Sequence, residues 1–286
     1  MKRNGGGVSV TRQEWIRYGA LLVLAVVAFG VAALAVMNTR GPGDAAGTAT
    51  ATPAASPSAT ATPSASATPG PTPTATQTAA ASAQPLKIRI PAQPVLLIVG
   101  DSYTAGDGAD RVDQGWAYLV AGELGFPANI DAIGGTGFVW GGGSRDDRGQ
   151  EYGVRLRGIA ATTPAFVPNL LILQGGQNDA LSNNPAAIQS ATTETVELAR
   201  TLWPGVQVVV LGPSAPQPLA DYLRDANNAV RAGAAAANTP FIDAYGAGWF
   251  TAANSQEFYA DGAHVNTAGH RYLADRFLAA WNTLVQ

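Results

Sequence analysis

The sequence predicts an α/β fold, a three-layer α/β/α sandwich around a parallel sheet, in residues 86–286. Short apolar runs without polar alternation, such as VLLIVG, are typical of strands that are buried on both faces of a parallel sheet. Longer amphipathic runs lie between them, and a repeated strand-then-helix order builds such a sandwich with right-handed crossovers. The expected strands are residues 95–100, 129–134, 169–174, 206–212 and 240–245.

The helices that we expect between and after these strands complete the outer layers. In such folds the site lies outside the carboxyl ends of the strands, so the polar residues that follow each strand are the candidates for chemistry. The expected helices are residues 115–125, 150–161, 185–202, 218–237 and 266–284.

An apolar segment near the N-terminus, residues 18–37, predicts a transmembrane anchor. It carries no charge over about 20 residues, enough at roughly 1.5 Å per residue to cross the hydrocarbon core of a bilayer. The preceding residues 1–17 carry a basic excess, which places this tail in the cytoplasm and the rest of the chain outside. The alternative is a cleaved signal sequence, for which ALA at 33–35 offers a cleavage site.

A Pro/Ala/Thr/Ser-rich segment, residues 38–85, separates this anchor from the folded domain. It has almost no apolar residues beyond alanine, so we expect it to form a disordered linker. The domain organisation is therefore a tail, an anchor or signal sequence, a linker and the catalytic domain at 86–286. We expect a single-pass protein of the cell membrane with an extracellular catalytic domain, or a secreted protein if the segment is cleaved.

Composition excludes several functional classes. The formal net charge is −3, so no basic face indicates nucleic-acid binding. The chain has no cysteine, which excludes disulfides, thiolate metal sites and a cysteine nucleophile. With only two histidines, His264 and His270, a histidine-rich zinc site is not expected.

Polar residues at the predicted strand ends include every part that a serine hydrolase needs. A serine hydroxyl is a weak nucleophile at neutral pH, so a histidine must accept its proton, and a carboxylate must orient that histidine. The developing oxyanion needs hydrogen-bond donors. In chain order the residues are Ser102 after the first strand, Gly134, Gly135 and Gly137 after the second, Asn178 after the third, and Asp261 with His264 before the last helix.

Other roles for the loop around Ser102 fit less well. A P-loop needs a lysine that is absent here, and the near match GDGADR to a dinucleotide fingerprint ends in Arg111 instead of glycine. The nucleophile elbow G-x-S-x-G fails because Thr104 stands in place of its second glycine.

Four blocks in this order, GDSYTAG, GGTG, GQND and DGAHVN, resemble those of the SGNH hydrolases, also called GDSL esterases/lipases. The resemblance covers roughly residues 94–286. It implies the flavodoxin-like five-stranded parallel sheet of that family and no metal or cofactor. It also implies a role for each matching residue: Ser102 is the nucleophile, His264 the base, Asp261 its orienting partner, and Ser102, Gly137 and Asn178 form the oxyanion hole.

The chain departs from the family pattern in two places. Tyr103 stands where the leucine that gives GDSL its name is found, a position expected to do no chemistry. The asparagine that often precedes the glycine block is missing, so Gly135 is the alternative to Gly137 as the oxyanion donor. We expect Asp179 to brace the serine loop or cap a helix, and His270 to be structural.

The predicted function is an exported serine esterase that hydrolyses short acyl esters, such as O-acetyl groups on cell-envelope carbohydrate. The alternatives are a lipase or lysophospholipase-type esterase, an O-acyltransferase on envelope glycans, and a non-enzymatic surface binding domain on the same fold. The expected partners are the ester substrate and the membrane, through the N-terminal helix. We expect the catalytic domain to be monomeric.

Overall fold

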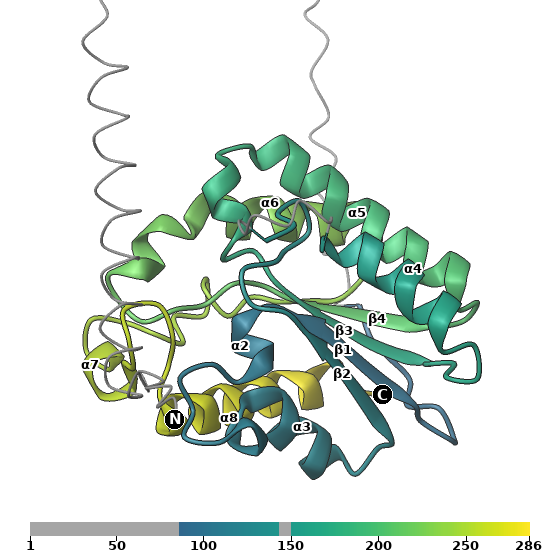
Figure 1. Cartoon of the computed structure of the whole chain (residues 1–286), viewed down its shortest axis with the longest axis horizontal. Helices are drawn as coiled ribbons and strands as arrows, with labels where there is room; N and C mark the ends of the chain where they lie inside the picture. Colours follow the sequence, from purple (N-terminus) through teal and green to yellow (C-terminus); the bar gives the residue numbers. More distant parts are fainter. Residues whose placement is uncertain (1–85, 143–149) are drawn as a thin grey trace, which may run out of the picture. The chain divides into compact units, whose positions relative to one another are not determined.

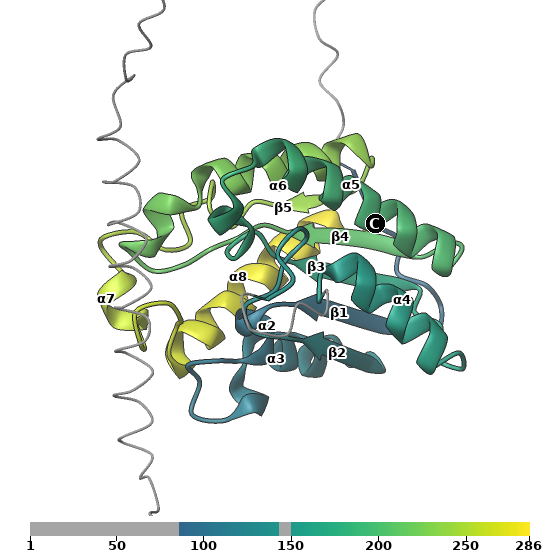
Figure 2. The ribbon, with the colours of Figure 1, turned by 45° about the horizontal axis from the view of Figure 1, so that its top comes forward.

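Five parallel strands form one sheet in the order β2-β1-β3-β4-β5 (Figures 1 and 2). The computed structural model describes residues 86–142 and 150–286, so the predicted tail, anchor and linker lie outside the described residues. The sheet confirms the predicted fold class and the flavodoxin-like strand order. The strands are β1 (Leu96–Gly100), β2 (Ala128–Ala132), β3 (Leu170–Gln174), β4 (Gln207–Leu211) and β5 (Phe241–Ile242).

Helices cover both faces of the sheet, as a three-layer sandwich requires (Figures 1 and 2). One face carries α3 (Trp116–Leu124) and α8 (Thr267–Leu284). The other carries α4 (Tyr152–Thr162), α5 (Pro185–Leu202) and α6 (Arg224–Ala236).

The three central strands are buried on both faces. Successive side chains of a strand point to opposite faces, so Leu96 and Ile98 pack into the core beneath α3 and α8. Their neighbours Leu97 and Val99 pack into the core beneath α4, α5 and α6. Each fully buried aliphatic side chain contributes about 1.5–3 kcal/mol to folding, which explains the unbroken apolar runs in the sequence.

Two predicted elements differ most from the structure at one end. Helix α6 begins at Arg224 instead of residue 218, after a separate 3₁₀ turn, Leu219–Tyr222, that starts behind Pro218. Strand β5 ends at Ile242, because the Asp243 carboxylate accepts the N–H of Gly246 and turns the chain.

Two short α-helices in the described part of the chain were not predicted. The first, α2 (Ser102–Ala105), begins at Ser102 directly after β1, and the second is α7 (Ser255–Phe258). The whole span of α2 is four residues, too short to show an amphipathic pattern.

The strand order brings the functional blocks to one edge of the sheet. β1 pairs with β2 on one side and β3 on the other, and its last residue, Gly100, is in register with Ala132 of β2. The connections after β1 and β3 leave in opposite directions, and ligands of such folds bind in the crevice that this reversal opens. The loops that follow Gly100, Ala132 and Gln174 therefore converge there.

Within residues 86–142 and 150–286, no helix combines the length and the apolar character that a membrane span needs. The predicted anchor at 18–37 lies outside this range.

Candidate active site

The serine of the first block is the first residue of α2, held by a cap. The Asp101 Oδ1 atom accepts the N–H of Tyr103 at 2.9 Å, the usual arrangement of a helix N-cap. Gly100 lets the helix fold back over the strand end, because a Cβ there would lie 2.0 Å from Thr104 Oγ1. Ser102 is thus half-buried at the carboxyl end of β1, with its side chain on the first turn of a helix.

Burial changes the titration of Asp101. Its side chain is fully buried, and this desolvation raises the pKa from 3.8 to about 7 against the opposing hydrogen bonds from Tyr103 and Gln174. Gln174 Nε2 donates to Asp101 Oδ2 at 3.2 Å, and Gln174 Oε1 accepts the Thr104 hydroxyl at 2.6 Å. A buried network of polar side chains therefore supports α2 from below.

This shift predicts a pH-dependent stability. The folded state binds the Asp101 proton more tightly than the unfolded chain, so this carboxyl destabilises the fold progressively as pH rises from about 4 through about 7. Asp101→Asn keeps an acceptor for Tyr103 and removes the titration. We expect the stability of the variant relative to wild type to rise by a few kcal/mol between pH 4 and pH 8. Urea unfolding of both full-length chains at the two pH values measures this, and a constant difference would contradict it.

The histidine of the last block is oriented by the aspartate three residues before it. His264 Nδ1 lies 2.9 Å from Asp261 Oδ2 and 3.1 Å from Oδ1. Asp261 Oδ1 also accepts the backbone N–H groups of Ala263 and His264, at 3.1 and 2.9 Å, which closes a tight turn. With Nδ1–H donated to the carboxylate, Nε2 is the nitrogen that remains for proton transfer.

The carboxylates around His264 govern its pKa. Burial by itself would lower the pKa of His264, but the hydrogen bond and charge of Asp261, with smaller effects of Asp107 and Asp101, raise it above the ordinary value. The same hydrogen bond holds the pKa of Asp261 far below its usual range, so Asp261 is ionised at any working pH.

The loops that carry Ser102 and His264 are in contact. The ring of Tyr103, the residue after Ser102, lies 5.8 Å from the His264 ring between centroids. Gly108 follows α2, and a Cβ at that position would lie 3.1 Å from His264 Cβ. In this structure the Ser102 hydroxyl makes no direct hydrogen bond with His264, and catalytic pairs in free enzymes often tighten only when substrate binds.

A base at His264 predicts the pH dependence of the rate. The imidazole must be neutral to accept a proton, so kcat/KM falls as pH drops through its pKa, which lies above 6.5. Asp261→Asn removes the group that raises this pKa, so we expect a lower plateau and an acid limb moved to lower pH. The pH–rate profiles of both enzymes between pH 5 and 9 test this. An unmoved limb in the variant would argue against the Asp261–His264 pair.

The third block places Asn178 beside the glycine loop. Asn178 Nδ2 donates one hydrogen bond to the Thr136 carbonyl at 2.9 Å. The amide carries a second hydrogen, and the Thr136 bond fixes the direction in which it points. Asn178 thus has the chemistry of an oxyanion donor with its orientation already set.

The N–H of Gly137, the expected backbone donor to the oxyanion, is hydrogen-bonded within the protein. It donates to the Trp140 carbonyl at 2.8 Å and closes a turn in the glycine loop. The lack of a side chain at Gly137 serves packing, because a Cβ there would lie 2.3 Å from Asp179 Oδ2. Among the described residues no acceptor takes the N–H of Gly135, which has a φ of +76°. Of the two candidates, Gly135 is thus the one whose N–H has no partner among the described residues.

The glycine loop, residues 134–140, also lies next to the serine. A Cβ on Gly134 would lie 3.5 Å from Ser102 Cβ. The buried Asp179 carboxylate holds the far side of the loop by accepting the N–H groups of Phe138, Val139 and Trp140, at 3.1, 2.8 and 3.2 Å. Asp179 therefore braces a loop, but it is the glycine loop and not the serine loop that the sequence suggested.

Arg155 is a supporting residue that the sequence did not reveal. This buried guanidinium on α4 donates to the Gly100 carbonyl at 2.9 Å and to Thr136 Oγ1 at 3.0 Å, and pairs with Asp131 at 3.1 Å. It therefore ties the end of β1 to the glycine loop. The only sequence signal was a charge within an amphipathic helix, which usually indicates a solvated face.

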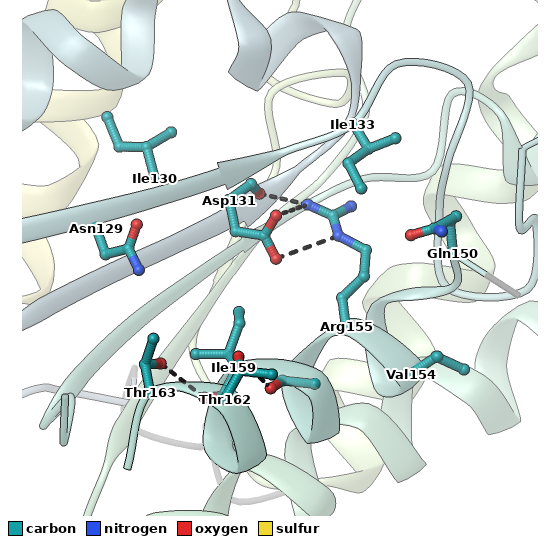
Figure 3. Close-up of a pocket in the computed structure, with 11 residues that line it drawn as sticks. Asn129, Ile130, Asp131, Ile133, Gln150, Val154, Arg155, Ile159, Thr162 and Thr163 are labelled. Atoms are coloured by element: carbon teal, nitrogen blue, oxygen red, sulfur yellow. Dashed lines mark hydrogen bonds and ion pairs between the residues drawn. The ribbon is translucent and has the colours of Figure 1, made fainter. Parts of the chain in front are cut away.

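The Asp131–Arg155 pair also forms one wall of a cavity of about 480 Å³ between β2 and α4 (Figure 3). Ile130, Val154 and Ile159 supply apolar parts of its lining. Neither Ser102 nor His264 lines this cavity.

His270 is structural, as expected. It is fully buried on α8; its Nδ1 accepts the N–H of Trp116 at 3.3 Å, and its Nε2 donates to the Asp107 carbonyl at 3.0 Å. Burial lowers the pKa of His270, which keeps it neutral in this bridging role. It anchors the loop after α2 to the helix that follows His264.

Comparison with known proteins agrees with the serine-hydrolase arrangement of the site. Residues 98–272 match the model of the GDSL-like lipase/acylhydrolase family. A GDSL lipase from Mycobacterium tuberculosis is 29% identical over 206 residues, which cover 68% of this chain and 83% of that protein.

Two solved structures share the fold. A carbohydrate esterase family 2 enzyme with a carbohydrate-binding domain, from Corynascus thermopiles (Myceliophthora fergusii), has a TM-score of 0.53 at 20% identity and covers 68% of this chain and 67% of that chain. A psychrotrophic esterase from Pseudoalteromonas has a TM-score of 0.51 at 16% identity and covers 66% and 97%. Since the family model spans more than half of the chain and includes Ser102, Asn178 and His264, the chain belongs to the GDSL-like lipase/acylhydrolase family and is a serine ester hydrolase.

Proposed function

We propose that the protein is an exported esterase that removes short acyl groups, such as O-acetyl, from cell-envelope carbohydrate through an acyl-enzyme. Ser102 Oγ attacks the ester carbonyl while His264 Nε2 accepts its proton. The tetrahedral oxyanion is bound by the N–H groups of Ser102 and Gly135 and by Asn178 Nδ2. His264 then protonates the leaving alcohol, and water hydrolyses the acyl-enzyme by the same route.

The observation that carries this proposal is the Asp261–His264 pair beside the serine helix. Its short Nδ1 hydrogen bond leaves Nε2 as the base, and Tyr103 and Gly108 on the Ser102 side contact His264. A binding domain would gain nothing from an ionised carboxylate fixed on the rear nitrogen of a histidine.

The positions of the cavities support short acyl groups, because no sizeable cavity among the described residues opens at the catalytic residues. A cavity of about 340 Å³ lies among residues that follow β4 and β5, such as Gln217 and Tyr245, but neither Ser102 nor His264 lines it. The space that Tyr103, Gln174 and Gln177 line beneath the site is about 10 Å³, too small for an alkyl chain. The carbohydrate esterase with the same fold supports a glycan as the alcohol part of the ester.

An acyl-length series tests the substrate class. We expect 4-nitrophenyl acetate and butyrate to give a higher kcat/KM than the decanoate, and acetate to be released from an O-acetylated glycan by wild type but not by Ser102→Ala. Preference for the decanoate would favour the second candidate, a lipid esterase, which the GDSL lipase relative supports. Adding a free sugar acceptor and analysing the products distinguishes hydrolysis from acyl transfer.

We propose further that residues 18–37 anchor the protein in the membrane with the catalytic domain outside. The uncharged apolar segment after a basic tail supports this orientation. Protease treatment of intact cells should remove the catalytic domain and leave the tail protected. A fully soluble secreted product would show instead that the segment is cleaved, and a protected catalytic domain would refute export.

A further inference from the structure

Tyr103 occupies a position that the sequence suggested does no chemistry, yet it links the two halves of the active site. It follows Ser102 in α2 and is only 3% exposed. Its hydroxyl donates to the carbonyl of Ala263 at 2.7 Å, across 160 residues of sequence. Its ring lies 5.8 Å from the His264 ring, at an interplanar angle of 48°.

The accepting carbonyl belongs to the peptide that orients the catalytic pair. The carbonyl of Ala263 and the N–H of His264 are the two sides of one peptide unit, and that N–H donates to Asp261 Oδ1 at 2.9 Å. Asp261 in turn binds His264 Nδ1. A continuous chain of hydrogen bonds therefore runs from the Tyr103 hydroxyl through one peptide unit to the Asp261 carboxylate and the imidazole.

Hydrogen bonds on both sides of a peptide polarise it and fix its plane, so each strengthens the other. We propose that Tyr103 is a positioning residue that sets the orientation of the Asp261–His264 turn relative to Ser102. This role rests on the proposed esterase mechanism but is built from contacts within the free protein. A leucine at this position has no hydroxyl and cannot make the bond.

The first test uses Tyr103→Phe, which keeps the ring and removes only the O–H. We expect kcat on 4-nitrophenyl acetate to fall about 5- to 20-fold with KM within about twofold, because substrate contacts stay while the base is less well oriented. Tyr103→Leu loses the ring contact as well and should fall further.

A second readout does not need activity. The full-length chain has only two histidines, so NMR of the histidine Cε1–H groups resolves His264, identified by its loss in His264→Gln. The charges and titratable groups that face His264 are Asp261 in its own turn, Asp101, Tyr103 and Asp107 at α2, and His270 on α8. Only the contact through Asp261 changes with the hydroxyl, so Tyr103→Phe should lower the pKa of His264.

Thr239→Val is the matched control, since it removes another buried hydroxyl that donates to a backbone carbonyl, that of Val208, at 2.6 Å. It should lose stability while kcat and the His264 titration stay at wild-type values. Tyr103→Phe behaving like this control would overturn the positioning role. If the wild type hydrolyses no ester but the His264 titration still moves in Tyr103→Phe, the positioning role holds and the proposed function fails.

Discussion

Replacing Ser102 with alanine should reduce kcat/KM for 4-nitrophenyl acetate by at least about 10³-fold. The substitution removes the nucleophile, so only the binding and oxyanion donors remain to accelerate attack by water. The cap at Asp101 and the burial of Tyr103 do not depend on the Ser102 hydroxyl, so the fold should be unchanged. Steady-state kinetics with both purified full-length chains measure the loss.

A covalent probe makes this prediction independent of the substrate chosen. A fluorophosphonate should label the wild type at Ser102, and peptide mapping should find no label in Ser102→Ala. Ser214 lies in the loop after β4 and is buried, so Ser214→Ala serves as a matched control that should label like wild type. Equal ester hydrolysis by Ser102→Ala and wild type would rule out Ser102 as the nucleophile.

Replacing Asn178 with alanine should lower kcat about 10²- to 10³-fold with a much smaller change in KM. The side-chain amide donates to charge that develops only as the tetrahedral intermediate forms, so its loss raises the barrier by about 3–4 kcal/mol. Initial rates of wild type and variant, measured from limiting to saturating 4-nitrophenyl acetate, give kcat and KM separately.

Loss of the bond from Asn178 to Thr136 could also disturb the glycine loop, so a second variant isolates that effect. Ser182 stands in the same connection, and its hydroxyl donates to the Asp179 carbonyl at 2.7 Å. Ser182→Ala should therefore perturb the loop without removing an oxyanion donor, and kcat should stay within about threefold of wild type. A similar loss in both variants would assign the effect to loop structure.

The sequence predicted most of the fold because the signals are local. The unbroken apolar run of 95–100 and the amphipathic run of 185–202 each report the environment of one element, and repeated strand-then-helix order limits how such elements assemble. The predicted ends of helices and strands were least accurate where a side-chain hydrogen bond turns the chain, as the Asp243 carboxylate does after β5. A capped four-residue helix at Ser102 left no periodic pattern to detect.

For the site, the amino-acid sequence was enough to predict the chemical groups and the edge of the sheet where they meet. Ser102, Asn178, Asp261 and His264 follow from residue type, order and strand ends. Which hydrogen-bond donors remain available, and which residues support them, could be seen only in the folded protein. The N–H of Gly137 already bonds to the Trp140 carbonyl, and Arg155 and Tyr103 make their contacts through carbonyls 55 and 160 residues away. The physical reason is that a hydrogen-bonding group serves substrate only when no other group in the fold already occupies it, and that depends on three-dimensional neighbours.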